Sequence, residues 1–258
     1  MSLIQEAWAT TWRSRFLWIL GLFAGVTGGT MSVGRMSLPS DADGTVLARQ
    51  VEQWLQANAS VLVGLAVVGA ATGLLLAVLS VIARGGITQA TLDLQSGQPM
   101  SLRAAWRAGT RWFWRFLGLL VVLGVVAACV VGASVLAWLA LGGIGVAFAA
   151  VTLTVGAIAS IVLAYAERAI VSHDLGPLQA LRYGWSIFER NVGASLLAWI
   201  VSVGISAVAG IAAGVAIAGL STVGVIVALI AIAAIANTFF WSYWTVAYLR
   251  LDARPSTS

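Results

Sequence analysis

The sequence contains very little charge. Of its 258 residues, 9% are charged and 60% are hydrophobic, and its mean hydropathy is +0.98. A soluble domain carries about 25% charged residues, so this chain cannot cover a water-facing surface with polar groups. We conclude that it is an integral membrane protein. No stretch of ordinary composition is long enough for a separate soluble domain, so residues 1–258 are expected to form one transmembrane domain.

The residue types that bind metals or form disulfides are almost missing. There is one cysteine, Cys129, in the middle of an apolar run, and one histidine, His173. One cysteine excludes an intramolecular disulfide, and His173 beside Asp174 does not make a set of metal ligands. With Pro177 three residues later, this stretch is typical of one helix ending and the next beginning. No GxSxG, P-loop, HExxH or kinase motif is present, so we expect no enzyme activity and no cofactor.

Six apolar runs have about the length, near 20 residues, that a membrane-spanning helix needs. They cover Phe16–Val33, Ala59–Ala83, Phe116–Leu141, Ile144–Ala166, Val192–Ala218 and Val223–Leu249. The third and fourth runs meet at Leu141–Gly143, and the fifth and sixth at Gly219–Thr222, which leaves room only for tight turns. The first run follows Arg13 and Arg15 as the apolar part of a signal peptide would. No A-x-A-like cleavage site comes directly after it, so we expect the segment to be retained.

Lysine is absent, and all 14 basic residues are arginine. If the six runs cross the membrane in turn, 12 arginines fall on one side and only Arg35 and Arg49 on the other. The positive-inside rule then places both termini, the tail 251–258 and the long loops after the second and fourth spans in the cytoplasm. The outer loop, residues 34–59, is expected to begin as an irregular turn and to continue as a short amphipathic helix.

The two long cytoplasmic loops contain related sequences. The segment "AAWRAGTRWFWRFLG" (104–118) aligns without gaps with "QALRYGWSIFERNVG" (179–193) at an offset of 75, and six of 15 positions are identical. The identical pairs are Ala105/Ala180, Arg107/Arg182, Gly109/Gly184, Phe113/Phe188, Arg115/Arg190 and Gly118/Gly193. This similarity indicates an internal duplication.

A weaker third copy lies at the N-terminus, at an offset of 100 from the middle copy. Its matching residues are Thr10, Trp12, Arg15, Phe16 and Leu17. Arginines end the second, fourth and sixth spans, at Arg84, Arg168 and Arg250. We therefore predict an all-α membrane protein with six transmembrane helices in three tandem repeats, each a cytoplasmic interfacial amphipathic helix followed by a two-span hairpin. The repeat units are about 1–84, 85–168 and 169–250. Duplicated hairpins are common in transporters, but they are also a simple way to build any helical bundle.

The amphipathic segments carry the candidate binding residues. On a helix, arginines four residues apart lie on one face, and Trp, Phe and Leu fill the opposite face. A helix of this kind lies in the membrane interface, where arginine side chains reach headgroup phosphates. The candidate lipid-interface residues are Arg103, Arg107, Arg111, Arg115, Arg182, Arg190, Trp106, Trp112 and Trp114. Of the tryptophans, only Trp114 falls on the arginine face. The alternative is generic anchoring that sets the height and angle of the next helix.

Nucleic-acid binding does not fit these segments, because it needs aromatic side chains that are free to stack on bases. Here most aromatic residues face away from the arginines and lie beside a span. Membrane lipids, with anionic ones favoured by the arginines, are therefore the expected partners.

The sixth span contains a second group of candidates, a possible intramembrane polar site. Its members are Asn237, Thr238, Ser242 and Tyr243. Polar residues within a span are often functional, but hydrogen bonds between helices explain them equally well. Pairs of glycines four apart, Gly69/Gly73 and Gly210/Gly214, predict close helix crossings within the chain or with a partner.

Three segments resemble a family of uncharacterised six-span bacterial and archaeal proteins, related to the membrane domain of some glycerophosphodiester phosphodiesterases. They are "TWRSRFLWILGLFAG", "ARGGITQATLDLQSGQPMSLRAAWRAGTRWFWR" and "AERAIVSHDLGPLQALRYGWSIFERNVG". The resemblance covers most of the chain and implies a bacterial or archaeal plasma membrane. The phosphodiesterase catalytic domain is absent, so no such activity is implied. A lipid-related or membrane-organising role fits the resemblance.

Three functions remain open from the sequence. The first is a non-enzymatic scaffold or accessory subunit of a larger membrane complex, with other proteins as partners. The alternatives are a transporter or permease for a small or amphiphilic solute, and an anionic-phospholipid-binding membrane protein.

Overall fold

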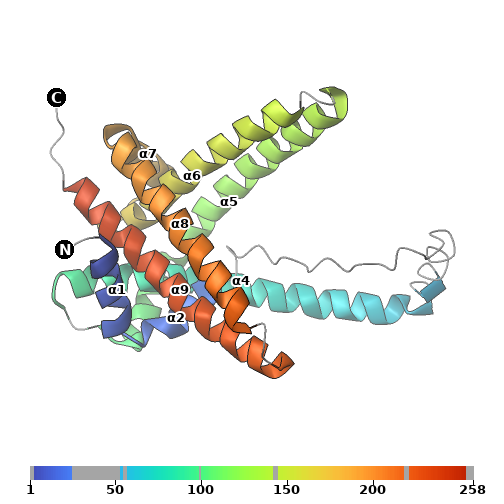
Figure 1. Ribbon diagram of the computed structural model, residues 1–258, viewed down its shortest axis with the longest axis horizontal. Helices are drawn as coiled ribbons and strands as arrows, with labels where there is room; N and C mark the ends of the chain where they lie inside the picture. The colour runs from blue at the N-terminus through green and yellow to red at the C-terminus, as the bar shows by residue number, and fades with distance from the viewer. Residues whose placement is uncertain are drawn as a thin grey trace.

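The computed structural model describes residues 3–24, 53–54, 57–98, 100–141, 145–217 and 221–253. The described residues form helices joined by short turns, without any strand, so the all-α prediction is confirmed. The helices are α1 (Leu3–Arg13), α2 (Leu17–Ala24), α4 (Ala59–Gln95), α5 (Leu102–Leu141), α6 (Gly145–His173), α7 (Pro177–Arg190), α8 (Val192–Ile217) and α9 (Thr222–Asp252) (Figure 1).

Five helices are long and apolar enough to cross a membrane. Their apolar segments are Ala59–Gln95, Leu102–Ala137, Ala150–His173, Val192–Val215 and Val223–Asp252. The membrane class predicted from composition is therefore supported. Of the predicted first span, Phe16–Val33, the described residues include α2 but nothing after Ala24. Arg35, Arg49 and most of the predicted outer loop also lie outside the described residues.

Helix ends follow the sequence signals closely at two places. His173 is the last residue of α6, Asp174 has a φ of +57°, and α7 begins at Pro177. The backbone N–H of Gly176 donates to the side chain of Gln179 at 3.3 Å and caps the new helix. The predicted helix boundary at this position is confirmed. At the start of α9, the Ser221 hydroxyl accepts from a backbone N–H in the first turn.

The junction between surface segment and span differs from the prediction in the middle copy. Residues 102–115 were expected to lie in the interface as a separate helix. Instead they continue directly into the span as one 40-residue helix, α5. No proline interrupts this stretch, so the hydrogen-bond ladder continues. In the other two copies the helix does break, between α1 and α2 and at Asn191 between α7 and α8.

The buried core lies at one end of the molecule, which we call the arginine-rich end. It comprises α1, α2, α7, the start of α5, and the C-terminal parts of α4, α6 and α9. The three surface segments pack in a cycle: the start of α5 lies on α4, α7 lies on α6, and α1 lies on α9. Each contacts the end of the span that precedes it, and α1 closes the cycle on the last span.

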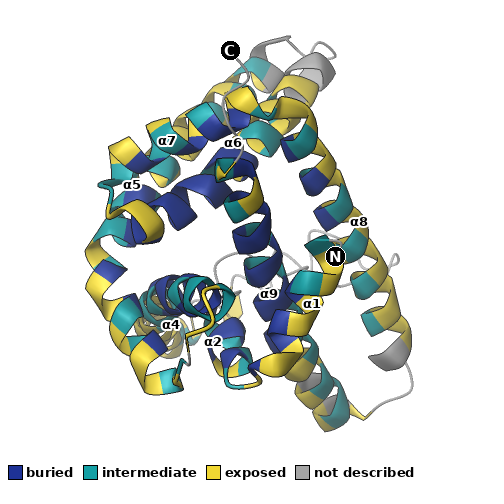
Figure 2. Cartoon of the chain, turned by 90° about the vertical axis from the view of Figure 1, so that its left-hand side faces the viewer, coloured by how far each residue is buried: buried dark blue, intermediate teal, exposed yellow. Residues whose placement is uncertain are grey.

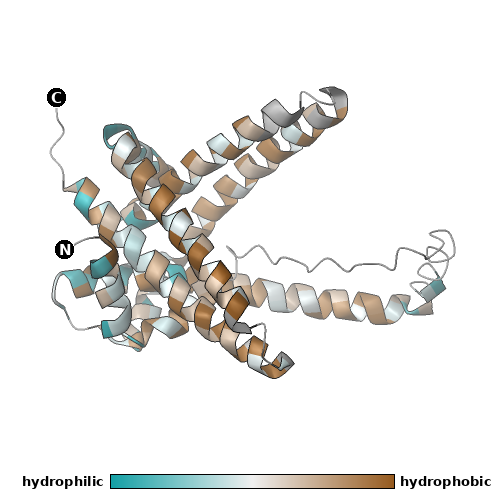
Figure 3. Cartoon of the chain, in the orientation of Figure 1, coloured by the Kyte–Doolittle hydropathy of each residue, from teal (hydrophilic) through white to brown (hydrophobic). Residues whose placement is uncertain are grey.

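Beyond this end the spans separate. Figure 1 shows α4, the α5–α6 pair and the α8–α9 pair extending as three diverging arms. Figure 2 shows buried residues concentrated in the region where the helices meet, and Figure 3 shows hydrophobic residues along the arms. Leu65 and Leu74 of α4, Leu136 of α5 and Ile211 of α8 are between 63% and 69% exposed. Apolar surface of this kind suits contact with lipid chains or with other membrane helices.

Candidate functional site

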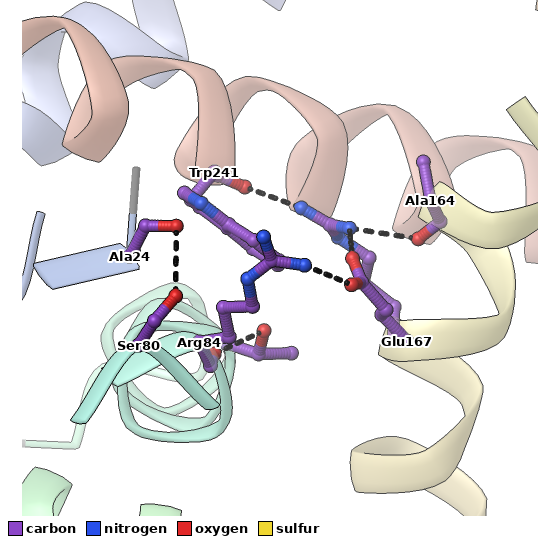
Figure 4. A network of polar contacts seen from close by, with 8 residues as sticks. Ala24, Ser80, Arg84, Ala164, Glu167 and Trp241 are labelled. Carbon is purple, nitrogen blue, oxygen red and sulfur yellow. Dashed lines mark hydrogen bonds and ion pairs between the residues drawn. The ribbon is translucent and has the colours of Figure 1, made fainter. Parts of the chain in front are cut away.

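Three helices bring a charged centre together inside the arginine-rich end. The Arg84 guanidinium of α4 lies 3.2 Å from one carboxylate oxygen of Glu167 in α6. Arg168, the next residue in α6, reaches the other carboxylate oxygen at 3.0 Å. Both guanidinium groups lie over the ring of Trp241 in α9, at 5.5 Å and 4.4 Å from its centroid. Figure 4 shows Arg84, Glu167 and Trp241 converging from separate helices. We call these four residues the Arg84–Arg168 centre.

The centre is buried. Arg84, Glu167 and Arg168 are 8%, 4% and 2% exposed. Arg168 also donates to the carbonyl of Ala164 at 2.8 Å and to the carbonyl of Trp241 at 3.3 Å. Carbonyl oxygens and an aromatic face stabilise a guanidinium but carry no net charge. Two cations and one carboxylate leave this buried centre with a net charge of +1.

A cavity of about 160 Å³ lies against the centre. Its lining comprises Arg84, Ser160, Leu163, Ala164, Glu167, Arg168, Phe240, Trp241 and Trp244. The charged residues form one part of the wall, and apolar side chains of α6 and α9 form the remainder. The shape suits a ligand with an anionic group and an apolar part.

The sequence showed that Arg84, Arg168 and Arg250 recur at span ends, but not that the first two meet. Glu167 was not singled out, although a carboxylate directly before a span-ending arginine was a usable signal. The third arginine behaves differently. Arg250 pairs with Glu6 of α1 at 2.5 Å, and both side chains are partly exposed.

The predicted interface residues of α5 divide into two groups. Arg103, Arg107 and Arg111 are exposed, and the Trp114 ring is 76% exposed. The apolar face, predicted to contact lipid, packs on protein instead: Trp112 is only 5% exposed. Trp106 is partly buried against the core formed with α2 and α4. The expected interfacial orientation of this face is therefore corrected, since α4 covers the surface that was assigned to lipid.

Arg115 has a local structural role. Its guanidinium donates to the backbone carbonyl of Asp174 at 2.6 Å and to the carboxylate of Asp174 at 2.5 Å. This contact ties α5 to the α6–α7 connection. Arg115 also lies 5.1 Å from the centroid of the Trp112 ring, and Arg111 lies at 4.9 Å from it.

The equivalent residues of α7 follow the same pattern. Arg182 and Arg190 are exposed, and the Nε of Arg190 donates to the carbonyl of Ser186 at 3.1 Å. The apolar face of α7 packs on α6, where Gly184 and Ile187 are buried. Amphipathicity in both segments thus reflects packing against a neighbouring span.

Two of the four polar residues proposed for the sixth span join helices together. The Thr238 hydroxyl donates to the carbonyls of Ala234 at 2.8 Å and, across to α2, of Leu17 at 3.0 Å. The Tyr243 hydroxyl donates to the carbonyl of Ala198 in α8 at 3.0 Å. These contacts support the interhelical hydrogen-bond alternative. Ser242 is buried with no hydrogen-bond partner among the described residues, and Asn237 is half-buried.

A second polar cluster joins α6, α7 and α9. Asp252 accepts from the Tyr183 hydroxyl at 2.7 Å and lies 3.3 Å from the Nε2 of His173. Burial, and then the hydrogen bond to the Asp252 carboxylate, raise the pKa of Tyr183 to about 12. Within the part of the chain that the structure describes, no three His, Cys, Asp or Glu side chains gather as a metal site.

Comparison with protein-family models, with curated proteins and with solved structures found no match to this chain.

Proposed function

We propose that this chain is a non-enzymatic multi-pass membrane protein that serves as a scaffold or accessory subunit of a larger membrane complex. The observation that carries the proposal is a stripe of small residues on α8. Ser206, Gly210 and Gly214 are exposed, whereas Ile205, Ala209 and Ala213 between them are partly covered. A Cβ atom added at Gly210 or Gly214 would meet no described atom within 4 Å.

Exposed apolar side chains alone would not support this proposal, because lipid chains solvate them well. Glycine is different: inside a helix it costs about 1 kcal/mol relative to alanine, and lipid gives nothing in return. Small residues four apart allow two membrane helices to approach closely. The chain uses glycine in this way at Gly109 and Gly184, where the packing leaves no room for a side chain. A partner helix on the outer face of α8 gives Gly210 and Gly214 the same purpose.

The proposal includes six spans in three repeats, with both termini in the cytoplasm. The cyclic packing of α1, α5 and α7 on α9, α4 and α6 supports three equivalent units. Gly109 and Gly184, matched in the sequence alignment, both pack directly on a neighbouring backbone. The first copy is less regular. Ala9, which aligns with Gly109, is exposed, and the buried small residue of α1 is Thr11.

The test is purification from native membranes in a mild detergent, followed by measurement of the mass of the complex. We expect the wild type to carry a partner in fixed stoichiometry, either another protein or a second copy of the chain. Gly210→Leu/Gly214→Leu should release it. Gly204→Leu is the matched control, because Gly204 is equally open but lies on another face of α8. Isolation of the wild type as a lone monomer, or equal loss in both variants, would contradict the proposal.

Anionic-phospholipid binding is a second candidate function. It is favoured by Arg103, Arg107 and Arg111, which are spaced four apart on the exposed face of α5. Each basic group near an anionic membrane surface contributes about 1 kcal/mol. Replacing all three with glutamine should remove the enrichment of anionic lipid that co-purifies with the protein. Unchanged lipid content would exclude a role for this face.

A further inference from the structure

The Arg84–Arg168 centre has the features of an anion-binding site. We propose that it binds one phosphate-bearing anion, with the phosphate against the two guanidinium groups and any attached apolar chain along α6 and α9. The phosphodiester of a lipid headgroup and free phosphate share this chemistry. The inference does not depend on the proposed assembly with a partner.

Charge balance is the first argument. Burying an ion costs free energy unless a counter-charge accompanies it, and Glu167 can balance only one of the two arginines. The other acidic side chains of the described part are engaged elsewhere: Glu6 pairs with Arg250, Asp174 with Arg115, and Asp252 with His173. Asp93 accepts from Gln89, and Glu189 accepts from Trp185. The remaining charge of the centre therefore calls for an anion from outside this set of residues.

The available donor is the second argument. The Nε of Arg168 is buried and has no hydrogen-bond partner among the described residues, whereas both of its terminal nitrogens are engaged. A guanidinium is a planar fork that suits phosphate oxygens well. The Trp241 ring, together with the carbonyls of Ala164 and Trp241, holds the Arg168 group in place before a ligand arrives. Such a site loses little conformational entropy on binding.

The cavity supplies the third argument. Its volume of about 160 Å³ is bounded by Arg84 and Arg168, and its remaining wall includes Leu163, Phe240 and Trp244. These apolar side chains belong to two membrane-spanning helices, so the cavity is continuous with surroundings that a lipid chain prefers. The geometry favours the lipid headgroup over free phosphate as the source of the anion.

The experiment uses the full chain in detergent and follows thermal unfolding with added ligand. A ligand that binds only the folded state raises the unfolding temperature with concentration. The probes are short-chain phosphatidylglycerol, short-chain phosphatidylcholine, and inorganic phosphate at matched ionic strength. We expect phosphatidylglycerol to raise the unfolding temperature more than phosphatidylcholine does. An equal rise with inorganic phosphate would identify the free ion as sufficient. No rise with phosphatidylglycerol or phosphate, or equal effects of the two lipids, would overturn the proposal.

Variants locate the effect. Arg84→Gln should weaken phosphatidylglycerol binding by about tenfold or more, because one charge-assisted contact is lost. Arg84→Lys keeps the charge and should retain part of the response. Arg13→Gln changes the net charge equally at an exposed position of α1 and should respond as the wild type does. Without ligand, Arg84→Gln should unfold no earlier than the wild type, because Glu167 and Arg168 remain as a neutral pair. A wild-type response in Arg84→Gln would overturn the proposal.

Discussion

Gly109 of α5 packs directly against the backbone of Ile82 in α4. A Cβ atom at Gly109 would lie 2.0 Å from the carbonyl oxygen of Ile82, which is far inside contact distance. Gly184 of α7 has the same relationship to α6, where a Cβ would lie 2.7 Å from the carbonyl oxygen of Val162. These two glycines set how closely the surface segments approach the spans, and thereby help to fix where α4 and α6 present Arg84 and Glu167.

Gly109→Ala and Gly184→Ala should therefore destabilise the protein. Overpacking of a close contact costs about 1–3 kcal/mol, which outweighs the better helix propensity of alanine. Gly124→Ala is the control within α5, since nothing described lies within 4 Å of its added Cβ. It should leave stability unchanged or raise it slightly. The midpoints of thermal unfolding in detergent test this order, and equal midpoints for the three variants would contradict it.

The Arg84–Arg168 centre leads to a prediction about Glu167 that needs no ligand. Glu167→Gln removes the only carboxylate from between two buried guanidinium groups. Breaking a buried ion pair by removing one partner costs about 3–5 kcal/mol, and here two cations would be left facing each other. Glu189→Gln makes the same chemical change at an exposed position of α7 and should cost less than about 1 kcal/mol. Similar unfolding midpoints for both variants would contradict the electrostatic account of the centre.

Hydrogen bonds between helices should make Thr238 and Ser242 respond differently. Thr238→Val removes a hydroxyl that donates to the Leu17 carbonyl of α2, and should cost about 1 kcal/mol. Ser242→Ala removes a buried hydroxyl with no described partner, and should be neutral or stabilising. The two residues lie one helical turn apart, so the comparison holds depth in the membrane nearly constant. Equal effects on the unfolding midpoint would argue against the α2–α9 contact.

Much of the local structure was predictable from the sequence, because it depends on local signals. Apolar runs of sufficient length gave five helices, and the stretch from His173 to Pro177 marked the end of α6 and the start of α7. The polar and apolar faces of residues 102–116 and 177–190 were also assigned largely correctly, as the burial of Trp112 and Ile187 shows.

What covers those apolar faces was not predictable. Lipid chains and protein interiors are both apolar, so they select the same side chains, and periodicity cannot distinguish them. The Arg84–Arg168 centre could not be predicted for another reason. Arg84 and Glu167 are 83 residues apart in the chain and meet only because α4, α6 and α9 converge. No local pattern encodes that convergence.

The Tyr183–Asp252 contact predicts a dependence on alkaline pH. The pKa of Tyr183 is about 12 in the folded protein and about 10 when unfolded, so the folded state holds the phenol proton more tightly. This contribution to stability is fully present below pH 10 and is lost as the pH rises through 12. The difference in tyrosinate absorbance between wild type and Tyr183→Phe should therefore titrate near pH 12. Asp252→Asn should lower the pKa only in part, because burial remains. A titration near pH 10 in the wild type would contradict this contact.

Asp174 should reverse the usual order of alanine and glycine. With a φ of +57° it has a left-handed backbone conformation, which glycine adopts freely and alanine adopts at a cost of about 1–2 kcal/mol. Both substitutions remove the same carboxylate, which pairs with Arg115 at an exposed site where ion pairs contribute less than about 1 kcal/mol. Asp174→Gly should therefore be more stable than Asp174→Ala by about 1 kcal/mol, whereas inside a helix alanine is the more stable of the two. Comparison of their unfolding midpoints tests the geometry of the α6–α7 connection directly. An alanine variant that is as stable as the glycine variant would mean that this connection is not held in the left-handed conformation.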